Sequence, residues 1–160
     1  MILVLLVIGI AIMLAAAALA IRSLRTPDYQ AGVDDIPKVL AALTASRAEN
    51  AFAAFVFTAA DGSADPEDPD DRVNLQFSLE EGRPGFDWVL LSHSNVRDEA
   101  RFTAFARDAG FNPKMEYGNG VRYLRVEDGD LVRLCQDVIV KMYRHAGPMD
   151  LVVEGFKWKP

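Results

Sequence analysis

The chain has 160 residues, of which 51% are hydrophobic, and 17 Lys and Arg against 23 Asp and Glu give a net charge of −6. This acidic balance argues against nucleic-acid binding, because neutralising phosphates requires a surplus of basic side chains. The single cysteine excludes an intrachain disulfide and a cysteine-rich zinc site.

The amino-terminal segment 1–21 contains no charged side chain. A helix of this length would be about 30 Å long, close to the hydrocarbon thickness of a bilayer. We therefore expect an uncleaved, single-pass signal-anchor that has the lipid bilayer as its partner. Arg22 and Arg25 follow the segment and no basic region precedes it, which favours a cytoplasmic domain. The alternative is a signal peptide cleaved near Ala20, with an exported product.

Residues 22–34 contain Pro27 and Gly32 and lack apolar periodicity, so we expect a juxtamembrane linker there. A soluble domain then spans 35–160. Its first element is a predicted helix that begins at Asp35 and ends between residues 46 and 50, and a buried strand over 51–57 follows.

Six acidic side chains and two prolines lie within residues 61–71. This composition predicts a solvated loop, because it offers no apolar side chain large enough to anchor a core. The order of the acidic residues does not match a calcium-binding EF-hand loop, which requires a fixed spacing of oxygen ligands.

Polar and apolar residues alternate over 73–80, which predicts a strand with one buried face. The later elements are read from turn residues and from helical spacing. They are a strand over 86–91, a helix from 94 or 95 to about 109, a strand over 121–127, a helix from about 130 to 146, and a strand over 151–158. The predicted fold is α+β: one small domain in which about three helices cover a mainly antiparallel sheet of about five strands.

The usual enzyme signatures are missing from the sequence, including glycine-rich phosphate loops and zinc-protease or serine-hydrolase motifs. Cys135 shares a helical stripe with apolar residues and should be a buried, unreactive thiol. We therefore expect no catalytic residue, no cofactor and no metal ligand.

Two stretches could form a surface for a protein partner. Arg125 and Glu127 lie two residues apart and should share one strand face. Phe156 and Trp158 have the same spacing at the carboxyl terminus, where they either close the core or form an exposed aromatic edge. We favour closure of the core, and keep all four residues as the candidate partner surface.

The sequence thus predicts a membrane-anchored, acidic protein-binding or regulatory module without catalysis. An inhibitor or immunity-type protein is one form of it, since an acidic domain can cover a basic site. The alternative is a membrane-tethered enzyme with a noncanonical polar site formed by Asp87, His93, Arg125 and Glu127. A pocket that joins these four side chains would favour the enzyme, whereas an apolar edge strand would favour the binding module.

Overall fold

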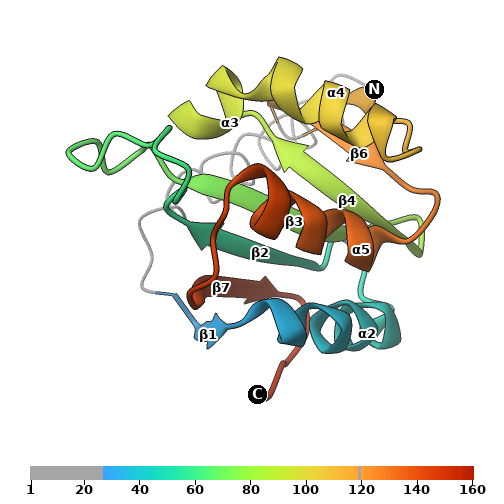
Figure 1. The fold of residues 1–160 in the computed structure, drawn as a ribbon. Helices are drawn as coiled ribbons and strands as arrows, with labels where there is room; N and C mark the ends of the chain where they lie inside the picture. Colours follow the sequence, from blue (N-terminus) through green and yellow to red (C-terminus); the bar gives the residue numbers. More distant parts are fainter. Residues whose placement is uncertain (1–26, 119) are drawn as a thin grey trace, which may run out of the picture.

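The computed structural model describes residues 27–118 and 120–160. Its strands form one antiparallel, seven-stranded sheet with the order β1-β7-β2-β3-β4-β6-β5 (Figure 1). The strands are β1 (Tyr29–Ala31), β2 (Phe52–Phe57), β3 (Val73–Glu80), β4 (Arg83–Val89), β5 (Lys114–Gly118), β6 (Val121–Val126) and β7 (Met149–Glu154). The helices are α2 (Ile36–Ser46), α3 (His93–Arg97), α4 (Glu99–Asp108) and α5 (Leu131–Asp137), with a 3₁₀ turn at Val33–Asp35 and a π-helical turn at Val138–Met142.

The α+β class is confirmed, but the predicted numbers of elements were wrong. The part of the chain that the structure describes has seven strands and four α-helices, where we expected about five and about three. Strand β1 is only three residues long and lies within the predicted linker. Strand β5 was not predicted, because the polar–apolar alternation over 114–117 is short and leads directly into the turn residues that begin at Gly118. The helix predicted to end near residue 109 is divided at Asp98 into α3 and α4.

The predicted membrane anchor is not supported. Within 27–118 and 120–160 no helix is long and apolar enough to cross a bilayer. The predicted span 1–21 and the first residues of the linker lie outside the described residues. We therefore withdraw the single-pass anchor, the bilayer as a partner and the cytoplasmic location.

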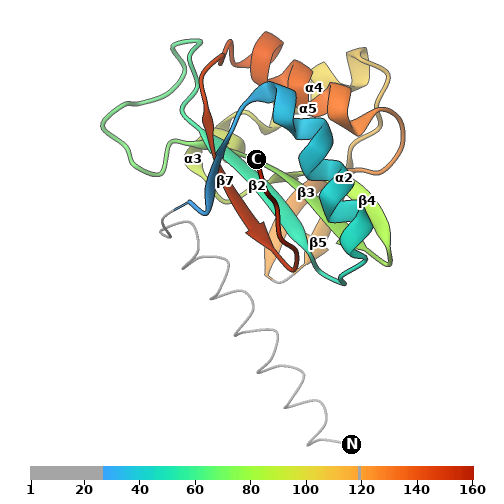
Figure 2. The same ribbon diagram turned by 90° about the horizontal axis from the view of Figure 1, so that it is seen from below.

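Helices α2, α4 and α5 pack on the same face of the sheet (Figures 1 and 2). Aromatic rings fill the space between the layers: Trp88 of β4 stacks on Phe102 of α4 at 4.4 Å between ring centroids. Cys135 of α5 is fully buried in this core, and burial raises the pKa of its thiol. Burying these rings and aliphatic side chains is the main source of the fold's stability.

The acidic segment 61–71 is docked onto the fold, contrary to the solvated loop that the composition predicts. Asp71 is only 3% exposed, and its carboxylate accepts hydrogen bonds from Arg97 Nη1 at 2.9 and 3.0 Å. The Ser94 hydroxyl donates to the same carboxylate, as does the backbone N–H of Asp65 at 2.7 Å. One carboxylate thus ties the loop to α3.

Two further contacts hold the loop against α3 and α4. Asp61 forms an ion pair with Arg101 at 2.8 Å, and Asp68 contacts His93 Nδ1 at 2.7 Å. Composition did not reveal this docking, because the basic partners lie about 25 to 40 residues further along the chain.

Asp71→Asn should destabilise the domain at neutral pH. Burial raises the pKa of Asp71, but hydrogen bonds from Ser94, the Asp65 amide and Arg97 outweigh it and lower the pKa from 3.8 to about 2. The ionised carboxylate therefore stabilises the fold above about pH 4, and this stabilisation is lost as the pH falls toward 2. We expect Asp71→Asn to lower the free energy of unfolding by about 2 kcal/mol at pH 7 and by much less at pH 2.

Denaturant unfolding at the two pH values measures this difference. Asp70→Asn is the matched control, because the Asp70 side chain is exposed. Equal losses of unfolding free energy for Asp71→Asn and Asp70→Asn would contradict the assigned role of Asp71. A loss for Asp71→Asn that is the same at both pH values would contradict it as well.

Candidate functional site

The pairing register assigns each strand residue to one of the two faces of the sheet, because residues directly opposite each other point to the same side. Phe77 lies opposite Phe86 on the face that the helices cover. On the other face, called here the open face, Gln76, Asp87, Arg125 and Lys114 form one row across β3, β4, β6 and β5.

Arg125 is the centre of this row. Its side chain is only 3% exposed, and Nη1 donates to Asp87 Oδ1 at 2.8 Å and to Ser78 Oγ at 2.8 Å. The Ser78 hydroxyl in turn donates to the second oxygen of Asp87. Nε of Arg125 donates to Glu127 at 3.0 Å, and Nη2 donates to the backbone carbonyl of Arg83 at 3.3 Å. All three guanidinium nitrogens are therefore engaged.

Charged groups around the rim complete what we call the Arg125 cluster, which consists of Ser78, Glu80, Arg83, Asp87, Tyr123, Arg125 and Glu127. Glu80 lies 3.4 Å from Arg125 Nη1 and accepts a hydrogen bond from the Tyr123 hydroxyl at 2.9 Å. Arg83 contacts Glu127 at 3.4 Å. Three carboxylates thus face two guanidinium groups, so the cluster is close to neutral.

Gly85 of β4 makes room for the buried guanidinium. A Cβ atom at this position would lie 2.3 Å from Arg125 Cζ, closer than any side chain allows. A residue without a side chain is therefore required for Arg125 to lie across β4 and reach Asp87.

The burial of this cluster changes the acidity of its members. Burial raises the pKa of Asp87 to about 6, against the opposing effects of Arg125 and Ser78. Burial and the hydrogen bond to Glu80 raise the pKa of Tyr123. The hydrogen bond from Arg125 lowers the pKa of Glu127. Ionisation of the inner carboxylate thus depends on Arg125 remaining in place.

This arrangement is suited to structure rather than to chemistry on a ligand. The Arg125 side chain is only 3% exposed and each of its three nitrogens already donates to a neighbour, and the Ser78 hydroxyl donates to Asp87 rather than to a histidine that could act as a base. The small cavity beside the cluster has a volume of about 60 Å³, far below the ~300–1,000 Å³ of typical ligand pockets. Among residues 27–118 and 120–160 no group of three or more metal-ligating side chains comes together.

The structure brings together three of the four residues proposed for an enzyme site. Asp87, Arg125 and Glu127 belong to the Arg125 cluster. His93 lies at the start of α3, where its exposed side chain contacts Asp68 of the acidic segment. The hydrogen bond to the Asp68 carboxylate raises the pKa of His93, and this pair holds the loop in place and takes no part in the Arg125 cluster.

The carboxyl-terminal aromatic residues lie at the opposite end of the sheet from β5. Trp158 is 3% exposed and packs edge-on against Tyr29 of β1, at 5.4 Å between ring centroids. Phe156 is half-buried and packs against the core. Of the four residues proposed as a partner surface, Trp158 and Arg125 are therefore buried.

The exposed edge of the sheet is a feature that the sequence did not reveal. Strand β5 is the last in the strand order and pairs only with β6 within the described part of the chain. Met115 is 46% exposed and Tyr117 is 73% exposed, although both are large and apolar or aromatic. Their alternation with Lys114 and Glu116 was the available signal, but this run of four residues leads directly into Gly118-Asn119-Gly120, a sequence that favours a turn.

Comparisons with protein-family models, with curated protein sequences and with solved structures found no match. The exposed surfaces of the domain are therefore the basis for inferring its function.

Gly85→Ala should destabilise the domain strongly. The added methyl group would displace the Arg125 guanidinium and leave the Asp87 carboxylate buried without its counter-charge. Removing one partner of a buried ion pair destabilises a protein by about 3–5 kcal/mol. We expect Gly85→Ala to lower the free energy of unfolding, measured with a chemical denaturant, by an amount in that range.

Gly147→Ala provides the control, because a Cβ atom there would meet His145 at 3.6 Å, an ordinary contact distance. Matching unfolding free energies for the two variants would show that the approach of Arg125 to Gly85 does not matter to the fold.

Proposed function

We propose that this domain is a non-catalytic protein-binding module that adds an extended segment of a partner protein to β5 as a further strand. The observation that carries the proposal is the free edge of β5, where Met115 and Tyr117 stand exposed. An edge strand presents unpaired backbone N–H and C=O groups, and an incoming strand can satisfy them. This proposal keeps the protein-binding role expected from the sequence, without the membrane anchor.

The opposite edge of the sheet is poorly suited to the same role. Strand β1 has only three residues. Beyond it, the Asp28 carboxylate accepts a hydrogen bond from the backbone N–H of Val153 in β7 at 3.2 Å. Trp158 packs on Tyr29 at the same edge. A short strand, a side-chain cap and a covering ring are ways in which proteins block strand addition.

The side chains of β5 define the chemistry of the partner segment. Met115 points to the same side as Leu124, the helix-covered face, so apolar side chains should lie opposite Met115 and Tyr117. Lys114 and Glu116 point to the open face, where an acidic and a basic side chain would complement them. Read antiparallel to β5, the expected partner sequence is apolar, basic, apolar, acidic.

A labelled peptide with the sequence Thr-Val-Lys-Val-Glu-Val should bind the full chain and change its fluorescence anisotropy. Met115→Lys should weaken binding about tenfold or more, because it places an unpaired charge against the incoming apolar side chain. Val140→Lys is the matched control: Val140 is 47% exposed and lies on the helical layer, away from β5.

A second control is the same peptide with proline in place of each valine, since proline lacks the N–H that a strand must donate. Equal binding by the wild type and Met115→Lys would contradict the proposal, and so would equal binding of the valine and proline peptides.

A further inference from the structure

We infer that the segment which β5 recruits is β5 of a second copy of this chain, so that two sheets join into one. This inference rests on the proposed function, because it names the partner for the same edge. Its basis is that Lys114, Met115 and Glu116 of β5 supply the basic, apolar and acidic part of the pattern that the same edge requires. Pro113, just before the strand, stands at the apolar position opposite Tyr117.

The complementarity follows from antiparallel pairing about a two-fold axis. When Met115 lies opposite Met115 of the second copy, Lys114 of each copy lies opposite Glu116 of the other. Two apolar side chains then meet on the helix-covered face, and two oppositely charged pairs form on the open face. In this register none of Lys114, Met115 and Glu116 lies opposite a like charge, and Met115 lies opposite an apolar side chain.

The neighbouring registers are less favourable. Moving the axis to Glu116 would place the two Glu116 carboxylates opposite each other, and moving it to Lys114 would oppose the two ammonium groups. Like charges directly across a strand pair are destabilising. Registers shifted by a single residue would turn the second copy over, so that its helices lie on the other side of the joined sheet. Among the registers centred on Lys114, Met115 or Glu116, all of which keep the helices on one side, charge therefore selects the one centred on Met115.

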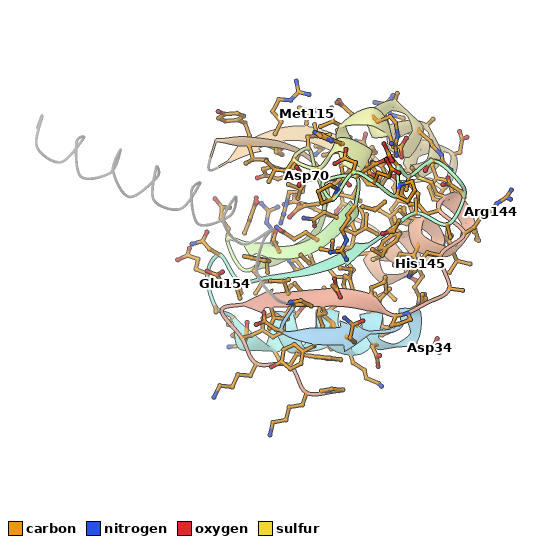
Figure 3. The ribbon with its side chains drawn as sticks, turned by 90° about the vertical axis from the view of Figure 1, so that its left-hand side faces the viewer. Asp34, Asp70, Met115, Arg144, His145 and Glu154 are labelled. Atoms are coloured by element: carbon orange, nitrogen blue, oxygen red, sulfur yellow. The ribbon has the colours of Figure 1, made fainter. Side chains whose placement is uncertain are left out.

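Within the described part of the chain, β5 lies at one end of the sheet. Figure 3 shows Met115 on the strand at one end of the molecule, while Asp34 lies near the other end, beside β1. The helices of both copies would cover the same side of one continuous sheet. Because β5 has only five residues, the interface is smaller than the ~1,200–2,000 Å² of stable complexes, and the dimer should dissociate on dilution.

Substitutions that reverse the charge of Lys114 or Glu116 test this inference. Sedimentation velocity on the full chain should show a concentration-dependent dimer for the wild type. Lys114→Glu and Glu116→Lys, each alone, should raise the dissociation constant about tenfold or more, because each turns both cross-strand pairs into like-charge pairs. The double variant K114E/E116K should dimerise like the wild type.

A mixture of the two single variants should also recover the dimer, because each supplies the charge that the other has lost. Lys114 lies near Glu127 of its own chain, but an effect within one chain could not be rescued by mixing. Residues 1–21 are identical in every sample, so association through that segment would not follow the charges. Single variants that dimerise like the wild type, or a mixture without recovery, would overturn the inference.

Cross-linking provides a second readout that does not depend on charge. Met115→Cys should form a disulfide-linked dimer on mild oxidation, because each thiol lies opposite its copy at a separation that a disulfide can span. The native Cys135 is fully buried and should not react. Val140→Cys, at a similarly exposed site, should stay monomeric. Equal cross-linking of the two variants would contradict pairing at Met115.

The outcomes separate this inference from the function on which it rests. If the valine peptide binds at β5 but no dimer forms, the edge recruits a different chain and only the inference fails. If neither the peptide nor a second copy binds, both proposals fail.

Discussion

An antiparallel sheet that does not close into a barrel leaves one strand at each end with unpaired backbone groups, and this constraint shapes both ends of the domain. At one end the fold provides its own remedy: a three-residue strand, the Asp28 carboxylate on the Val153 amide and the ring of Trp158. At the other end β5 is longer and carries two exposed apolar or aromatic side chains. The difference between the two edges is the reason to assign the binding role to β5.

A second constraint acts on the open face of the sheet. No helix among the described residues covers it, yet Asp87 and Arg125 are almost fully buried there, so neighbouring side chains must satisfy their charges. Arg125 does this by pairing with Asp87 and Glu127 while lying over Gly85. Such a network commits each nitrogen of Arg125 to a partner within the fold, even though an arginine near several carboxylates resembles an active site in a sequence. Its structural effect is to hold β4 and β6 together, and β6 in turn supports β5.

The sequence predicted those features that depend on local periodicity. The alternation over Val73–Glu80 identified β3, because that strand has one covered face and one open face. The same period of two placed Arg125 and Glu127 on one face, where they now form an ion pair. Strand β5 could not be recognised in the same way, because its polar–apolar alternation covers only four residues before the turn sequence that begins at Gly118.

Contacts between distant segments could not be read from the sequence. The pairing of His93 with Asp68 joins a helix start to an acidic loop 25 residues away. Because the loop composition alone indicated solvation, His93 was grouped with the wrong carboxylate, Asp87. The packing of Trp158 on Tyr29 likewise depends on a strand in the predicted linker.

Amide hydrogen exchange of residues 114–118 at low and high protein concentration tests the central claim most directly, because it reads the backbone groups that a second strand would pair. The account predicts that exchange at β5 slows as the concentration rises, while exchange at β1 does not change. Exchange at β5 that is independent of concentration, or that slows equally at both edges, would contradict it.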